Sequence, residues 1–406
     1  MNMASSTLTR TPAGASWWAV VAVGLATFSV VTTEMLPVGV LDAMAGTLGT
    51  STGAAGLTMS LPALLAALFA PLVVIAAGGM DRRSLLCGLL GLLLIANLAS
   101  ALAPSLPWLL AARILVGVCI GGIWAVAGGL AARLVPTHAV GLATSIVFGG
   151  VAAASVLGVP LGALIGELGG WRWAFGSMAL LSGLVLVLLL AVLPSLPVSS
   201  AVSLRQFGTQ LGNRKLQAGL LLTLFLVGSH FMAFTFVRPL LLWVGGFDVR
   251  WIPGGLLAYG IAGIVGNFLV GIVAARRTKL TLMAIALGLL LTQILFLTIG
   301  SSPVGSGAAL LVWGLAYGGV SVGLMTWMMK AVPDAVEIAT ALYVGVFNIG
   351  IAVGAWSGGH AVDGLGLHTA LWLAGGTAGM AFLIAVNAGL EKQALCARGG
   401  LEQLKS

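Results

Sequence analysis

Charge is what this sequence lacks. Only 7% of the 406 residues are charged, and 60% are hydrophobic, whereas about a quarter of the residues in soluble domains are charged. So few charged side chains cannot cover a water-soluble fold of this size. The apolar surface must therefore face lipid, and the sequence predicts an all-α membrane protein.

Motifs of catalysis and cofactor binding are also missing. The three cysteines, Cys87, Cys119 and Cys396, form no C-x-x-C pair, which argues against a metal site or a disulfide framework. Glycine pairs such as Gly121-Gly122 lack the Lys-Ser/Thr partner of a phosphate-binding loop. We expect no enzyme activity and no cofactor.

The net charge of +8 does not indicate nucleic-acid binding. The basic residues are scattered in ones to threes between apolar runs and form no basic helix or patch. The partner that these properties imply is the lipid bilayer, and we expect a monomer.

A membrane span needs about 20 mostly apolar residues. The sequence contains twelve such stretches, and the first is too long for a signal-peptide core. They cover about 17–41, 53–77, 84–103, 107–132, 140–165, 171–193, 216–242, 253–275, 280–299, 306–329, 338–362 and 368–389.

The longest interior polar stretch divides the spans into two sets of six. The predicted domains are an N-terminal tail (1–16), an N-terminal six-helix bundle (17–193), a linker (194–215), a C-terminal six-helix bundle (216–389) and a C-terminal tail (390–406).

Lysine and arginine indicate the orientation, because loops on the cytoplasmic side carry an excess of both. With both termini cytoplasmic, fourteen of the eighteen basic residues lie on that side, two lie opposite, and Arg113 and Arg238 fall within spans. We expect a multi-pass protein of the bacterial inner membrane, with tails and linker in the cytoplasm.

The two halves repeat each other. A shift of 196 residues places Gly158, Gly162 and Gly170 on Gly354, Gly358 and Gly366. A shift of 202 residues places Thr33 and Pro37 on Thr235 and Pro239. The matched spans run in the same direction, as in carriers built from two parallel six-helix repeats around a midplane site.

Glu34 is the one acid well inside a predicted span, and an ionisable group there is a candidate functional residue. It lies about 25 Å from the cytoplasmic face, and Arg113 lies about 9 Å from the opposite face. In a core of about 30 Å these depths nearly coincide. The two side chains can therefore pair, and proton uptake can release them. Neither residue has a counterpart in the other half, which favours a functional role; for Arg113 a bracing role stays open.

Other polar and aromatic residues within spans are candidates for proton transfer or for a substrate pocket. His230 can relay protons, bind substrate, or be a buried imidazole bonded to a neighbouring helix. The pocket candidates are Trp124, Trp327, Tyr343 and Asn348. Asp81-Arg82 is either a topology signal or a cytoplasmic latch in which Asp81 pairs with the other half.

Two motifs resemble those of the major facilitator superfamily. Arg113-Ile114-Leu115-Val116-Gly117 looks like its arginine-glycine motif, and the run through Gly158-Val159-Pro160-Leu161-Gly162 looks like its antiporter motif. The resemblance implies that Gly158, Pro160 and Gly162 take part in the conformational change. The segment Asp81-Arg82-Arg83-Ser84 departs from the superfamily pattern, because no glycine-arginine pair follows it.

Thr33-Glu34-Met35-Leu36-Pro37 resembles the bacterial drug/proton antiporter branch. Gly121-Gly122-Ile123-Trp124-Ala125 and Gly323-Leu324-Met325-Thr326-Trp327 look most like its purine ribonucleoside efflux pumps. Sugar-efflux and chloramphenicol-type exporters are near alternatives. The expected function is proton-coupled efflux of a small organic molecule, with purine nucleosides as candidates and multidrug or sugar export as alternatives. An uncoupled facilitator or importer would not need Glu34, and a membrane sensor would need a soluble signalling domain.

The predicted topology can be tested with reporter fusions. Fusions at residues 205 and 248 should report opposite sides of the membrane, because one site lies in the basic linker and the other in a sparsely charged loop. Reporters on the same side would contradict the twelve-span arrangement.

Overall fold

The computed structural model describes residues 17–76, 80–136, 139–197, 211–333 and 336–388. Within these ranges the chain is helical and contains no strand. The predicted tails 1–16 and 390–406 and most of the predicted linker lie outside the described residues.

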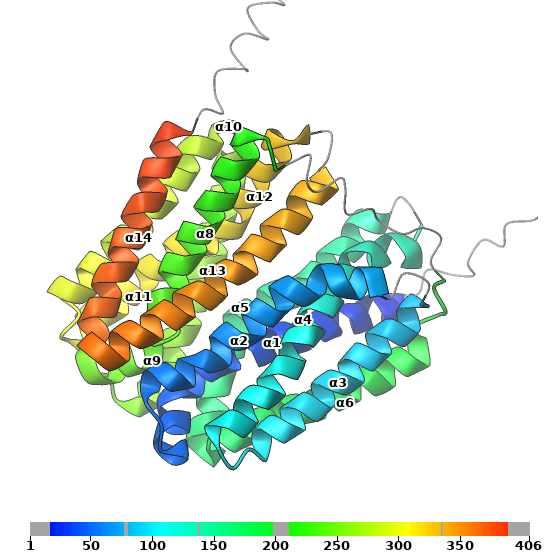
Figure 1. Ribbon diagram of the computed structural model, residues 1–406, viewed down its shortest axis with the longest axis horizontal. Helices are drawn as coiled ribbons and strands as arrows, with labels where there is room; N and C mark the ends of the chain where they lie inside the picture. Colours follow the sequence, from blue (N-terminus) through cyan, green and yellow to red (C-terminus); the bar gives the residue numbers. More distant parts are fainter. Residues whose placement is uncertain (1–16, 77–79, 137–138, 198–210, 334–335, 389–406) are drawn as a thin grey trace, which may run out of the picture.

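Six helices form the N-terminal half (Figure 1). They are α1 (Trp17–Leu48), α2 (Thr52–Ala76), α3 (Arg82–Ala101), α4 (Leu106–Leu134), α5 (Val140–Gly169) and α6 (Trp171–Val192).

The C-terminal half consists of longer and shorter pieces. They are α8 (Arg214–Phe234), α9 (Val237–Pro239), the π-helical turn η2 (Leu240–Val244), the 3₁₀ turn η3 (Val249–Trp251), α10 (Ile252–Thr298), α11 (Pro303–Gly318), α12 (Val320–Ala331), α13 (Val336–Leu365) and α14 (Leu367–Asn387).

The twelve predicted spans are present, although α10 joins two of them. Eleven described segments are long and apolar enough to cross a membrane, and one of these, Val249–Thr298, has 50 residues and holds two spans. A loop expected near residues 276–279 is instead a single non-helical residue, Arg277, inside α10. The turn between the two spans is made at this residue, whose φ of −134° and ψ of 54° are not helical.

Proline interrupts the first helix of each half at the matched position. Pro37 lies in α1, which has non-helical backbone at Val40. In the second half, α8 ends at Phe234, and Pro239 is followed by the π-turn. Proline has no N–H, so the carbonyl four residues earlier loses its helical partner. The predicted span 216–242 is therefore broken into α8, α9 and η2.

The repeat appears in the packing as well as in the sequence. A Cβ at Gly158 of α5 would lie 3.3 Å from the Cα of Thr32 in α1. At the matched position in α13, a Cβ at Gly354 would lie 2.4 Å from the carbonyl oxygen of Gly228 in α8. Glycine therefore lets the backbones of each helix pair approach closely.

The turns before α6 and α14 match too. Gly170 and Gly366 have φ of 88° and 90°, which L-residues with a side chain rarely adopt. This match and the glycine packing show that the halves are two copies of one helical unit.

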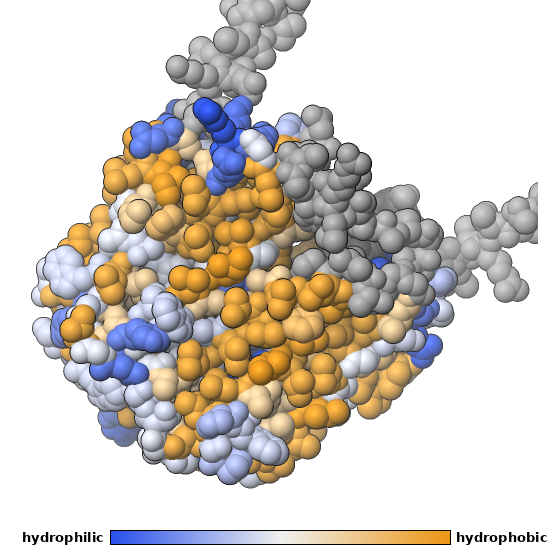
Figure 2. Space-filling view, viewed as in Figure 1, coloured by the Kyte–Doolittle hydropathy of each residue, from blue (hydrophilic) through white to orange (hydrophobic). Residues whose placement is uncertain are grey.

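Large apolar side chains cover the outside of the molecule. Ile272 is 74% exposed, Phe268 68% and Leu184 61%, and apolar residues spread over much of the face in Figure 2. This surface suits contact with lipid and accounts for the low charge of the chain.

The packing of α13 on α8 can be tested with two glycines of the same helix. Gly354→Ala should lower the midpoint of thermal unfolding in detergent, because its Cβ would meet the Gly228 backbone and overpacking costs about 1–3 kcal/mol. Gly345→Ala is the control, since nothing lies within 4 Å of its Cβ position. Equal midpoints for the two variants would contradict this packing.

Candidate functional site

Arg113 ties three helices together through backbone oxygens. Its Nη1 donates to the carbonyl oxygen of Thr33 (2.9 Å), and its Nε donates to that of Thr58 (3.0 Å). These two carbonyls lie four residues before Pro37 and Pro62, so both have lost their helical donors. The fully buried guanidinium thereby supplies the hydrogen bonds that the two prolines remove from α1 and α2.

Glu34 lies beside this arginine without forming an ion pair with it. Nη2 of Arg113 donates to the backbone oxygen of Glu34 (3.2 Å), which places the two residues at the same depth. Among the described residues, the ion pairs are Asp42–Arg238 and Asp248–Arg250. The predicted pairing of the Glu34 and Arg113 side chains is therefore not formed in this conformation, in which Nε, Nη1 and Nη2 of the arginine donate to backbone oxygens.

The Glu34 carboxyl group is buried, and its Oε1 has no hydrogen-bond partner. The nearby Thr32 hydroxyl is also buried without a partner. A carboxylate in this position is costly, because burial disfavours the charged form. Such a group can change its protonation without breaking a structural ion pair.

Parallel aromatic rings form a column in the C-terminal half. The rings of Tyr317 and His230 stack with centroids 3.3 Å apart and 9° between their planes. His230 and Phe234 are 4.6 Å apart, and Phe234 and Tyr259 are 4.8 Å apart. We call these four residues the aromatic column; it draws on α8, α10 and α11.

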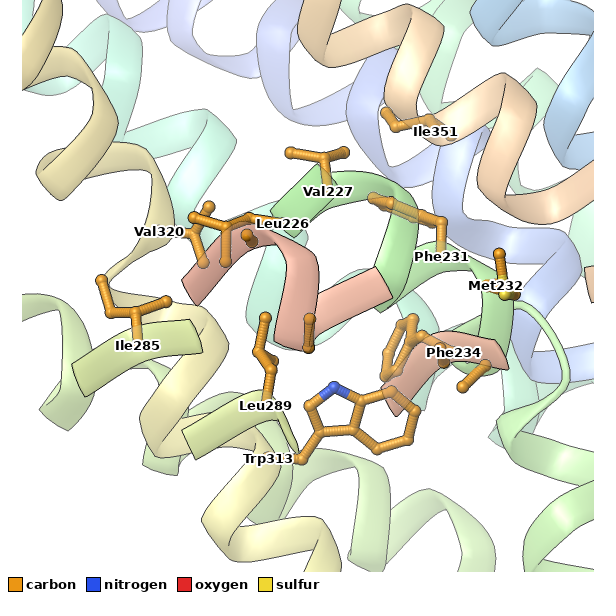
Figure 3. Packing of buried hydrophobic residues seen from close by; sticks show 14 of the residues in the cluster. Leu226, Val227, Phe231, Met232, Phe234, Ile285, Leu289, Trp313, Val320 and Ile351 are labelled. Atoms are coloured by element: carbon orange, nitrogen blue, oxygen red, sulfur yellow. The ribbon is translucent and has the colours of Figure 1, made fainter. Parts of the chain in front are cut away.

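Trp313 packs against the side of the column. Its ring lies edge-on to Phe234, with centroids 5.5 Å apart, and Figure 3 shows the two side by side. His230 is buried, and its Nδ1 has no partner. One of the predictions for His230 was a hydrogen bond to a neighbouring helix. Nδ1 makes no such bond.

Polar contacts join the two halves where α1 passes into α2. Asp42 of α1 pairs with Arg238 of α9. Asp363 of α13 accepts hydrogen bonds from the Ser51 hydroxyl (2.5 Å) and from the Gly53 N–H at the start of α2 (2.8 Å). These residues form what we call the α1–α2 tie.

Close backbone packing accompanies the α1–α2 tie. A Cβ at Gly53 would lie 2.2 Å from the carbonyl oxygen of Gly359. Helices α2 and α13 therefore touch directly where the halves meet, as Figure 1 shows. This end of the molecule is closed.

At the other end, Asp81 bonds within its own half. Its carboxylate caps α3 through the Arg83 N–H and accepts from Ser195 and the Leu196 N–H. The Ser195 hydroxyl is the main cause of a pKa for Asp81 below its usual range. The predicted latch to the opposite half is therefore not formed in this conformation. Arg82 donates its backbone N–H to Leu196.

A family model described as Major Facilitator Superfamily matches residues 23–355. The chain belongs to the major facilitator superfamily. It is a multi-pass membrane transporter and not an enzyme. The purine ribonucleoside efflux pump NepI of Salmonella paratyphi A is 34% identical over 361 residues, which cover 89% of this chain and 91% of that protein. The pump of the same name from Salmonella typhimurium is also 34% identical over 361 residues, with the same coverage.

Solved superfamily structures share the fold. A bacterial homologue of the human lysosomal transporter Spinster, inward-facing and occupied, has a TM-score of 0.71 at 16% identity and covers 92% of this chain and 97% of that chain. The human organic anion transporter MFSD10 (TETRAN) has a TM-score of 0.65 at 18% identity and covers 92% and 100%.

The predicted pocket residues each make their own contacts in the structure. Trp124 of α4 packs near Phe148 of α5, with centroids 6.1 Å apart. Trp327 of α12 is fully buried, and its indole N–H donates to the Lys215 carbonyl oxygen (2.9 Å). The structure therefore gives Trp327 a packing contact at the start of α8.

Asn348 and Tyr343 both lie on α13. The Asn348 amide donates to the carbonyl oxygen of Val344 in the same helix (2.9 Å). Tyr343 is buried and its ring packs edge-on to Phe347, with centroids 5.7 Å apart. Tyr343 also lies within electrostatic range of Tyr317 of the aromatic column.

Sequence reasoning missed the α1–α2 tie. Asp42 and Asp363 lie at the ends of predicted spans, where acids are common and do not stand out. The repeat matches Asp363 with Glu167, but this match does not indicate a contact with the other half. Arg238 within a span was a signal, but its partner lies in the other half. The spacing of residues along one helix cannot reveal an ion pair whose members belong to different halves.

The α1–α2 tie can be tested by distance measurements between halves. Spin labels would replace the exposed Gly46 and Gly364 in a background without the native cysteines. Asp363→Ala should shift the label separation toward longer values, because it removes both bonds to the start of α2. Asp248→Ala is the control, because Asp248 pairs with Arg250 within one half. Identical distance distributions for both variants would argue against the tie.

Proposed function

We propose that this chain exports purine ribonucleosides in exchange for protons by alternating access of the two halves. It would act as a monomer, without a cofactor, and draw its energy from the proton motive force across the bacterial inner membrane. The observation that carries the proposal is the unpaired Glu34 carboxyl group.

Glu34 has the properties that a coupling site needs. Its side chain is buried in the middle of a span and lies within electrostatic range of Tyr317 in the other half. A carboxyl group between two moving halves changes its surroundings when they move. Because Arg113 holds the backbone rather than the carboxylate, proton binding can respond to that movement without disturbing the fold.

The relatives support the substrate and the direction of transport. The NepI proteins are named purine ribonucleoside efflux pumps, and the match extends over 91% of their length. Sugars and hydrophobic drugs are the alternative substrates for a carrier of this family.

The distribution of basic residues supports an orientation with both termini in the cytoplasm. The α1–α2 tie would then lie on the periplasmic side, and the structure would represent an inward-facing state. Two of the solved relatives are inward-facing, with TM-scores of 0.71 and 0.69.

One proton per cycle supplies enough energy for concentrative export. A membrane potential of about 100 mV contributes about 2.3 kcal/mol for one charge, and one pH unit contributes about 1.4 kcal/mol. For a neutral nucleoside exchanged with one proton, the total of about 3.7 kcal/mol sustains a gradient of several hundredfold. ATP is not required.

The coupling role of Glu34 is tested by Glu34→Gln in everted vesicles. The glutamine keeps the shape of the side chain but cannot titrate. Uphill, proton-driven nucleoside transport should be abolished, and some nucleoside binding should remain. Adding nucleoside to the purified protein should no longer release protons.

Glu167→Gln, at the end of α5, is the matched control and should retain uphill transport. A Glu34→Gln protein that still builds a gradient sensitive to an uncoupler would reject Glu34 as the coupling site. Parallel assays with sugars and hydrophobic drugs test the substrate class, and transport that only equilibrates in the unaltered protein would indicate a facilitator.

A further inference from the structure

The aromatic column has one accessible end. His230 is 1% exposed, Phe234 4% and Tyr259 8%, and all three lie within the C-terminal half. Tyr317 is half-buried. His230 covers one face of the Tyr317 ring at a centroid distance of 3.3 Å, so a planar ligand could stack only on the opposite face.

The surroundings of Tyr317 bring both halves together. It lies within electrostatic range of Glu34 from α1 and of Tyr259 and Tyr343 from α10 and α13. Tyr317 is therefore the tyrosine that links the buried acid of α1 to the aromatic column. This is the region where alternating access would expose a substrate first to one side and then to the other.

His230 supports Tyr317 as a flat ring. Its Nδ1 is buried with no partner, and rings surround it: Tyr317, Phe234 and Tyr259 stack with it, and Phe231 and Trp313 lie edge-on. These contacts hold His230 in place, and His230 and the edge-on ring of Phe231 (centroids 6.2 Å apart) in turn set the tilt of the Tyr317 ring. A preset ring binds a planar ligand at a lower cost in conformational entropy.

We propose that the purine base of the transported nucleoside stacks on the face of Tyr317 opposite His230 and extends the aromatic column by one ring. This inference rests on the proposed function and assigns its substrate specificity. Tyr317 is the platform that touches the base, and His230 is a positioning residue behind it. The larger ring system of a purine gains more from stacking than that of a pyrimidine.

The experiment is equilibrium binding of inosine, adenosine and uridine to the purified protein in detergent. Tyr317→Leu should raise the Kd for the two purine nucleosides about tenfold, within the range measured when a stacking ring is removed. The loss for uridine should be smaller, so the preference for purines should fall. Tyr317→Phe should keep the unaltered affinities, because it retains the ring.

Phe296→Leu is the control for general loss of packing. Phe296 is buried and packs edge-on against Trp313, with centroids 5.8 Å apart, but it is not part of the column. This variant should leave the ratio of purine to pyrimidine affinity unchanged.

The outcomes separate this inference from the proposed function. Unaltered protein that binds purine nucleosides, together with a Tyr317→Leu variant that binds them equally well, would overturn the stacking platform alone. An equal loss for purines and uridine in Tyr317→Leu would also overturn it. Unaltered protein that binds no nucleoside would contradict the proposed function as well.

Discussion

The guanidinium of Arg113 is the contact on which the N-terminal half depends. Pro37 and Pro62 leave the carbonyls of Thr33 and Thr58 without helical donors inside a membrane span, where water cannot replace them. Arg113 donates to both oxygens and so joins α1, α2 and α4. An unsatisfied carbonyl at this depth would cost several kcal/mol. The prolines within α1 and α2 are tolerated because one side chain completes both helices.

This use of the arginine leaves Glu34 unpaired. A buried acid with a committed counter-ion would stay charged, and a change in its protonation would disturb the packing around it. Here the positive charge remains near the carboxyl group, but its hydrogen bonds go to backbone oxygens. Arg113 thereby has the structural role, and Glu34, which lies beside it in space, is left free to titrate.

The two halves repeat one helical unit but carry different groups at matched positions. The position of Arg113 corresponds to Gly314 in the repeat, where a Cβ would lie 2.3 Å from the Tyr259 carbonyl oxygen. At this position the C-terminal half brings the backbones of α11 and α10 into direct contact, whereas the N-terminal half joins its helices through the charged side chain of Arg113. Around that contact it carries the aromatic column. A binding surface in one half and a titrating group in the other would link substrate and proton through the movement of the halves.

The sequence predicts the twelve spans, the repeat and the common depth of Glu34 and Arg113, because hydropathy and helix rise determine them along the chain. It does not predict what Arg113 bonds to, since the freed carbonyls belong to two other helices. The aromatic column and the α1–α2 tie were missed for the same reason: their members come from separate helices. The sequence indicates a basic loop between the spans 253–275 and 280–299 but not its tightness: the structure makes the turn at the single non-helical residue Arg277.

Infrared difference spectroscopy of the purified protein tests most directly whether Glu34 exchanges its proton when substrate binds. The account predicts a band of a protonated carboxyl group that disappears when a purine nucleoside is added and that is absent from Glu34→Gln. A band that nucleoside does not change, or that persists in Glu34→Gln, would contradict it.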